Sequence, residues 1–363
     1  MIFNDALSSL KYFTGRPLPH PAYLIFFVTS KCVGKCRHCF YWESLNQPED
    51  PLTVAEVEKV AGSMGRLLQV TFTGGEPFLR EDLPELVAVF ARLNRVYHLG
   101  LATSGFHPDR VESGVRKILD SCRESRITVG LPIEGPAELN DEIRGVKGFY
   151  ERTTETLSRL KSLKRSHRRL TLLVDITASG FNRGRLLETY ELVRDRLQPD
   201  HINLILTRGV PREGSAKDLD PEEAALLLTR MEDDIRKGLV AGYSFFGKLL
   251  HAKDIVLRRM ALDIYSRQAY RLPCQAGRVA GVLMPEGDVF PCELWSEPIG
   301  NAREQNYDLS AIWQSPQARA ARAQILDSRC VCYHQCFLSN TIFFNLRSWP
   351  EMIKEWLRIM AGR

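Results

Sequence analysis

Residues 23–39 read YLIFFVTSKCVGKCRHC, a run of apolar residues that leads directly into three closely spaced cysteines. Residues 23–28 predict a buried strand, because aromatic and β-branched residues favour strands. The cysteines follow as Cys32-x3-Cys36-x2-Cys39 on the next loop. Three thiolates on one short loop can hold three irons of a [4Fe–4S] cube and leave the fourth iron open to a small molecule. A zinc site with His38 as the fourth ligand, or unconnected core thiols, are the alternatives at this point.

Further strand-like runs alternate with helical patterns up to about residue 207. The predicted strands after the first are residues 69–73, 97–102, 126–131, 170–176 and 201–206. The predicted helices are residues 53–65, 83–93, 109–125, 150–163 and 185–196, the first opened by a capping box of Thr53 and Glu56. Six βα units in succession predict an α/β fold, a partial (β/α)6 TIM-like barrel with its site at the carboxyl ends of the strands.

The rest of the chain divides by composition into segments around this barrel. We expect an N-terminal extension at residues 1–21, the barrel at 22–215 and a helical connection at 216–271. Cysteine, glycine and proline become dense at 272–340, which predicts a small cysteine-rich domain held together by metal. Residues 341–363 predict an amphipathic terminal helix that packs on the body of the protein.

Composition excludes several classes of protein. The chain has 363 residues, 44% of them hydrophobic, and its formal net charge of +5 is spread without a dominant basic tract, so no nucleic-acid partner is expected. We find no apolar stretch long enough to span a bilayer and no secretion signal. A reducing cytoplasm is therefore the expected location, where the nine cysteines serve as metal ligands or core residues, such as Cys122, rather than disulfides.

Polar motifs follow the second, third and fourth predicted strands. Gly74-Gly75-Glu76-Pro77 follows the second strand, where glycines let the backbone approach a ligand and the carboxylate can accept hydrogen bonds from an ammonium group. Ser104 follows the third strand. All of these residues are candidate cofactor-binding residues.

Two charged residues follow the fourth predicted strand. Arg144 offers a guanidinium fork that suits a carboxylate. Glu134 is either a cofactor or substrate contact or a solvent-exposed carboxylate.

Together these motifs resemble the radical S-adenosylmethionine superfamily, whose defining feature is the Cys-x3-Cys-x2-Cys loop after strand one. The resemblance implies that S-adenosylmethionine chelates the open iron through its amino and carboxylate groups. One electron from the reduced cluster then breaks the S–C5′ bond and yields methionine and a 5′-deoxyadenosyl radical, which takes hydrogen from a substrate. It also implies that Cys32, Cys36 and Cys39 are catalytic metal ligands and that a flavodoxin or ferredoxin supplies the electron.

The resemblance assigns further roles by position and shows where this chain departs from the family. The Gly-Gly-Glu-Pro element corresponds to the one that contacts the methionine amino group, Ser104 lies near the ribose, and Arg144 pairs with the methionine carboxylate. Pro132, Glu134 and Asn140 replace the usual Ser, Asp and His. The contact that this Ser makes with S-adenosylmethionine in the family is therefore absent or is made by another residue.

The C-terminal cysteines resemble the auxiliary-cluster appendage of the same superfamily, called SPASM or twitch. The five cysteines of this segment allow one auxiliary [4Fe–4S] cluster. Cys274, Cys292 and Cys336 are the expected ligands, and Cys330 and Cys332 compete for the fourth place. A structural zinc site is the alternative.

The sequence predicts the substrate less closely than it predicts the radical reaction. We expect a small polar or carbohydrate-like molecule, because the short segment before the first strand leaves no room for a leader-peptide domain. Peptide or protein side-chain modification and a lipid-linked substrate, suggested by residues 343–360, are the alternatives. A non-enzymatic electron carrier, or a protein whose fold is held together by zinc, is a further alternative. It is disfavoured because it gives no function to the Gly-Gly-Glu-Pro element and Arg144. The loop at residues 208–214, with Arg208 and Arg212, is expected to be a solvated turn rather than a substrate contact.

Overall fold

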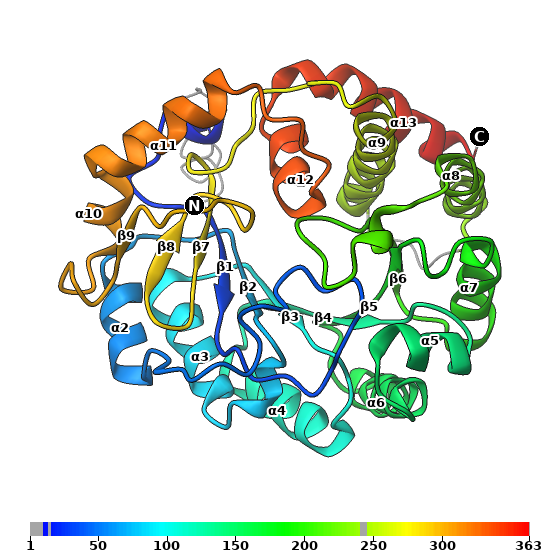
Figure 1. Ribbon diagram of the computed structural model, residues 1–363, viewed down its shortest axis with the longest axis horizontal. Coiled ribbons are helices and arrows are strands. Elements are labelled where there is room, and N and C mark those ends of the chain that lie inside the picture. The colour runs from blue at the N-terminus through cyan, green and yellow to red at the C-terminus, as the bar shows by residue number, and fades with distance from the viewer. Residues whose placement is uncertain (1–9, 14–15, 240–244, 363) are drawn as a thin grey trace.

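The computed structural model describes residues 10–13, 16–239 and 245–362, and part of the expected N-terminal extension lies outside these residues. Its centre is one nine-stranded sheet in the order β6-β5-β4-β3-β2-β1-β7-β8-β9 (Figure 1). Neighbouring strands from β1 to β6 all run parallel, which confirms the predicted partial barrel. These strands are β1 (Tyr23–Phe27), β2 (Gln69–Thr73), β3 (His98–Ala102), β4 (Arg126–Pro132), β5 (Leu170–Ala178) and β6 (His201–Leu206).

The outer face of the barrel is apolar and is covered by the crossover helices. Val70 and Phe72 of β2 are fully buried against them, and the same alternation runs along β4, β5 and β6. The helices are α2 (Val54–Gly62), α3 (Leu83–Asn94), α4 (Pro108–Ser121), α5 (Ala137–Arg144), α6 (Phe149–Lys164) and α7 (Leu186–Leu192), the last continued by a π-helical turn at Val193–Leu197. The capping box of Thr53 and Glu56 opens α2 as predicted. The short, polar α5 was not predicted.

The inner face of the barrel is polar. His98 of β3 contacts Gln69 of β2 at 3.1 Å and Thr128 of β4 at 2.8 Å, so a hydrogen-bonded row crosses three strands. Asn203 of β6 donates to Asp175 of β5 at 3.1 Å on the same face. Burial lowers the pKa of His98 to about 4, so the ring is neutral near neutral pH. This lining suits a polar reaction chamber better than a packed apolar core.

The cysteine-rich segment continues the barrel sheet. Strand β7 (Ala280–Leu283) pairs in parallel with β1, and β8 (Asp288–Phe290) and β9 (Gly300–Asn301) follow antiparallel. Helices α8 (Pro221–Arg236) and α9 (Phe245–Arg267) fill most of the predicted helical connection. The remaining helices are α10 (Leu309–Gln314), α11 (Pro316–Asp327), α12 (Gln335–Phe343) and α13 (Trp349–Ala361).

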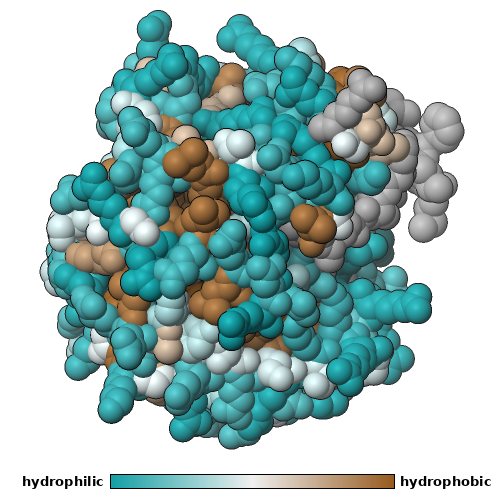
Figure 2. Space-filling view, turned by 90° about the vertical axis from the view of Figure 1, so that its right-hand side faces the viewer, coloured by the Kyte–Doolittle hydropathy of each residue, from teal (hydrophilic) through white to brown (hydrophobic). Residues whose placement is uncertain are grey.

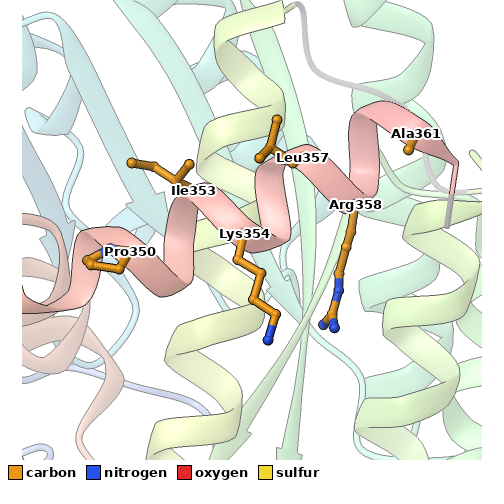
Figure 3. A pocket seen from close by; sticks show the side chains of 6 residues that line it. All are labelled: Pro350, Ile353, Lys354, Leu357, Arg358 and Ala361. Carbon is orange, nitrogen blue, oxygen red and sulfur yellow. The ribbon is translucent and has the colours of Figure 1, made fainter.

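The terminal helix α13 packs on the body, as expected. Met352, Glu355 and Ile359 are buried, and Glu355 pairs with Arg236 of α8 and Arg259 of α9. The opposite side of α13 exposes an apolar and basic row that lines a shallow pocket (Figure 3): Pro350, Ile353, Lys354, Leu357, Arg358 and Ala361. The face of the molecule on this side is mainly hydrophilic, with separate hydrophobic patches (Figure 2). Within the described residues, none of the helices has the length and apolar character needed to cross a bilayer.

Candidate active site

The first cysteine loop starts where β1 ends and is held by the end of α5. The backbone N–H of Lys35 donates to the carbonyl of Arg144 at 3.0 Å, and that of Arg37 donates to Ile143 at 3.0 Å. Cys32, Cys36 and Cys39 are partly buried and unpaired by disulfides. A helix end therefore fixes the loop at the carboxyl edge of the sheet, where active sites of parallel α/β folds occur.

The two glycines after β2 press against the start of this loop. Gly75 donates to the carbonyl of Thr29 at 2.9 Å, and Glu76 donates to that of Lys31 at 2.8 Å. A Cβ on Gly75 would lie 2.7 Å from the Lys31 carbonyl carbon and 2.8 Å from the Ser30 oxygen. Only glycine fits this approach, so the motif positions the cysteine loop directly.

The Glu76 carboxylate joins the ends of β2 and β3. It is buried and accepts hydrogen bonds from Phe78 N at 3.0 Å, Thr103 Oγ1 at 2.8 Å and Ser104 N at 2.7 Å, with a further one from Ser104 Oγ. Pro77 opens the short 3-10 turn Pro77–Leu79. Within the chain, Glu76 and Ser104 thus bind each other, and the contacts to S-adenosylmethionine expected of Gly74, Gly75, Glu76, Pro77 and Ser104 stay predictions.

Glu134 and Arg144 form a buried ion pair beside the first cysteine loop. Glu134 is fully buried, so the alternative of a solvent-exposed carboxylate is wrong. Its second oxygen accepts from Thr177 N at 2.8 Å. Arg144 also donates from Nη1 to Cys36 Sγ at 3.5 Å. Burial raises the pKa of Glu134, and the Arg144 charge opposes that rise.

Several buried polar atoms around this pair have no partner within the chain. They are Arg144 Nε, His38 Nδ1 and Asn140 Nδ2. Such orphan groups are costly unless a ligand satisfies them. The other side-chain atom of Asn140 does have a partner, since its Oδ1 accepts a hydrogen bond from Glu134 N at 2.9 Å.

The first cysteine set fits an iron–sulfur cluster better than zinc. Burial raises the pKa of Cys32 to about 12 and that of Cys39 to about 11, so these thiols need a bound cation to ionise. Ligands of one zinc ion lie roughly 3.8 Å apart. Among the described residues, Cys32, Cys36 and Cys39 do not bring their sulfurs within 4.8 Å of one another. His38 faces Glu134 at 3.7 Å instead of completing a zinc site.

The loop after β6 lies on the first cysteine loop. Arg212 N donates to the Cys39 carbonyl at 3.0 Å, and the Arg208 guanidinium stacks 4.5 Å from the ring centroid of Phe40. Arg37 and Glu213 form an ion pair at 2.9 Å between the two loops. The expectation of a solvated turn is therefore wrong, because tertiary contacts that the sequence pattern does not reveal hold this loop over the site.

Four of the five C-terminal cysteines gather beside β7. Cys274, Cys330 and Cys332 line one small cavity, and Cys330 and Cys332 are hydrogen-bonded to each other. Cys292 interacts electrostatically with Cys274 and Cys330. Burial raises the pKa of Cys274 and Cys292, as it does in the first set. Three thiols line this cavity and Cys292 interacts with two of them, which fits a four-ligand cluster in which both Cys330 and Cys332 would serve.

Cys336 has different neighbours. Its sulfur lies within 4.8 Å of a carboxylate oxygen of Glu293 and a ring nitrogen of His334. The charged groups that act on it are Glu293, Arg208 and Asp175. The sequence pattern gave no sign of this group, because Glu293 and His334 are far apart in the chain. Cys122 is a buried core thiol, as predicted.

Comparison with known proteins agrees with this geometry. Residues 26–193 match the Radical SAM superfamily, and residues 274–337 match a family described as an iron–sulfur cluster-binding domain, SPASM. The chain is 27% identical to the pre-heme d1 synthase of Dinoroseobacter shibae over 346 residues, 88% of this chain and 81% of that protein. It is 26% identical to the PqqA peptide cyclase of Rhizobium meliloti over 319 residues, 84% of this chain and 77% of that protein.

Two solved structures share the fold. Streptococcus suis SuiB bound to S-adenosylmethionine aligns with a TM-score of 0.63 at 17% identity, over 88% of this chain and 71% of that one. The anSMEcpe structure with bound AdoMet aligns with a TM-score of 0.63 at 17% identity, over 94% of each chain. The cofactors are thus a [4Fe–4S] cluster, S-adenosylmethionine and an auxiliary cluster. The chain belongs to the radical S-adenosylmethionine superfamily and carries a SPASM iron–sulfur domain.

Proposed function

We propose that this enzyme removes a hydrogen atom from a peptide or protein side chain and passes an electron of the resulting radical to the auxiliary cluster. The observation that carries the proposal is the closeness of the two cysteine sets. Phe40 and Tyr41, which directly follow Cys39, pack against the same apolar cluster as Cys274 and Cys292. A substrate on the inner face of the barrel would therefore meet both sites.

The chain's own residues prepare the first site for S-adenosylmethionine. Cys32, Cys36 and Cys39 would hold the cluster, which in its reduced form would supply the electron for cleavage of S-adenosylmethionine. Gly74 and Gly75 hold the cysteine loop against the sheet edge. Arg144 donates to Cys36 Sγ and balances the Glu134 charge, so the site keeps a cation beside a ligating sulfur.

The comparisons favour a peptide over the small polar or carbohydrate-like molecule expected from the sequence. A relative that spans most of the chain is named as a PqqA peptide cyclase. SuiB has also been solved with the precursor peptide SuiA, and anSMEcpe with the Cp18Cys peptide. A lipid-linked substrate rests only on the exposed apolar row of α13.

A tetrapyrrole is the second candidate. The pre-heme d1 synthase and the AdoMet-dependent heme synthase of Methanosarcina barkeri each match more than four-fifths of this chain. Arg208 and Arg212, which lie over the first cysteine loop, would suit the carboxylates of such a substrate.

A deuterium-transfer experiment tests the proposal. Anaerobically reconstituted enzyme is given S-adenosylmethionine, a reductant and deuterated candidate peptides, and 5′-deoxyadenosine is analysed by mass spectrometry. We expect deuterium in 5′-deoxyadenosine and a matching mass loss in a peptide. Deuterium transfer from carboxylated porphyrins, with none from any peptide, would replace the first candidate with the second.

A further inference from the structure

Arg212 is a half-buried arginine beside the first cysteine loop, and among the described residues its side chain forms no ion pair. Its Nε atom is buried without a hydrogen-bond partner. The neighbouring carboxylate, Glu213, binds Arg37 instead, since Arg37 Nε donates to its two oxygens at 2.9 and 3.0 Å. A shielded cation without a counter-charge is costly. We therefore expect Arg212 to face an anion that a bound group brings to the site.

The backbone holds Arg212 against the third cysteine of the first set. Its N–H donates to the carbonyl of Cys39 at 3.0 Å, and the N–H of Glu213 donates to the carbonyl of Arg37 at 2.9 Å. The guanidinium carbon lies 5.9 Å from the ring centroid of Trp42, within the range of a cation–π contact. The indole Nε1 of Trp42 is also buried without a partner. Two backbone hydrogen bonds and one ring contact therefore keep this guanidinium beside the loop.

The charge of Arg212 acts on the Cys39 thiol. Burial raises the pKa of Cys39 to about 11 and the Cys36 thiol adds to this rise, whereas the charges of Arg212 and Arg144 oppose it. The two arginines reach the cysteine set from different elements, since Arg144 ends α5 and donates to Cys36 Sγ at 3.5 Å. Arg144 is already paired with the buried Glu134. Arg212 is therefore the arginine whose charge is left to the cysteine set.

We propose that the Arg212 charge raises the reduction potential of the cluster held by Cys32, Cys36 and Cys39. A one-electron donor delivers one electron to this cluster and thereby adds one negative charge beside the thiolates. A nearby cation stabilises that added charge, so it favours the reduced form over the oxidised form. Net charge and hydrogen bonds to the sulfurs are among the factors that set such potentials. The proposal rests on the family of the chain and is independent of the substrate class.

A substrate carboxylate is the alternative anion for Arg212, as in the tetrapyrrole candidate above. The two roles differ in what they require. An effect of Arg212 on the reduction potential is present in enzyme without substrate, whereas the binding of a substrate carboxylate leaves the potential of that enzyme unchanged. A measurement on substrate-free enzyme therefore separates them.

A redox titration of the reconstituted holoenzyme tests the proposal. Anaerobic protein without S-adenosylmethionine or substrate is poised at a series of potentials, and the reduced clusters are measured by electron paramagnetic resonance. The signal of the first cluster is identified as the one that Cys36→Ala lacks. We expect Arg212→Gln and Arg212→Met to keep the wild-type iron content. Both should lower the equilibrium constant for reduction of the first cluster at least about tenfold, which corresponds to about 59 mV for one electron.

Arg212→Lys keeps the charge and should retain a potential near that of the wild type. Arg116→Gln is the matched control, because it removes one positive charge from an exposed pair with Glu112 on α4, and it should leave the potential unchanged. Equal potentials in the wild type and the two neutral variants would overturn the proposal. Equal losses in Arg212→Lys and Arg212→Gln would overturn it as well, because they would assign the effect to the shape of the side chain rather than to its charge.

Discussion

Gly75→Ala tests whether the motif after β2 acts by positioning the cysteine loop. The added Cβ would lie 2.7 Å from the Lys31 carbonyl carbon, whereas ordinary contacts begin near 3.4 Å. The obstacle is backbone, and the Lys31 carbonyl oxygen lies closer still, so the chain just before Cys32 must move by at least about 0.7 Å. Misplacement of a reacting group by 1 Å can cost about 100-fold in rate, so we expect a loss of roughly 10- to 100-fold in S-adenosylmethionine cleavage.

The assay measures 5′-deoxyadenosine formed per minute by anaerobically reconstituted, reduced enzyme with saturating S-adenosylmethionine. Iron content is measured on the same sample, so that a rate loss is separated from a cluster loss. Gly62→Ala is the matched control, because nothing lies within 4 Å of a Cβ at that position. Gly75→Ala with full iron content and the wild-type rate would refute the argument that close backbone approach sets the loop position.

Three further outcomes are expected. Arg144→Met leaves the buried Glu134 carboxylate without its partner and should lower the free energy of unfolding by about 3–5 kcal/mol in anaerobic urea titrations. Arg116→Met, the control, breaks an exposed helical ion pair and should change the free energy of unfolding by at most about 0.5 kcal/mol. Burial holds the pKa of His98 at about 4, below its ordinary value, so the unfolded chain takes up the proton first. The free energy of unfolding should therefore be highest above about pH 6.5 and should fall as the pH falls toward 4. Between about pH 7.5 and 5.5, His98→Gln should lose about 1 kcal/mol less of this free energy than the wild type. Equal losses in the two proteins would contradict this cause. Cys330→Ala should lose about half of the iron but still form 5′-deoxyadenosine, and unchanged iron would exclude Cys330 as a ligand.

Local sequence signals were sufficient for the barrel. Strands β1, β2 and β5 are runs rich in aromatic and β-branched residues, and β2 and β6 lie where the pattern placed them. Strand β7 was missed because it has four residues, AGVL, and gains its place from pairing with β1 more than 250 positions earlier. Short strands whose stability comes from a distant partner carry little signal of their own.

The sequence predicted those parts of the site whose chemistry depends on the spacing of residues along the chain. The first cysteine loop is such a case, and its place after β1 follows from the sequence. The partners of Glu134 were not evident, because α5 is too short and polar to predict and it is α5 that turns Arg144 back toward Glu134. Spacing also suggested Cys336 as a cluster ligand. In the structure it lies in the first turn of α12 beside Glu293 and His334.

The central claim is that a cluster at Cys32, Cys36 and Cys39 cleaves S-adenosylmethionine. Its most direct test is the yield of 5′-deoxyadenosine from reduced, reconstituted wild type and from Cys36→Ala under the same anaerobic conditions. We predict formation by the wild type, about half the iron in Cys36→Ala, and no product from that variant. A fully loaded, reduced wild-type enzyme that forms no 5′-deoxyadenosine, or a Cys36→Ala variant that forms it at the wild-type rate, would contradict the claim.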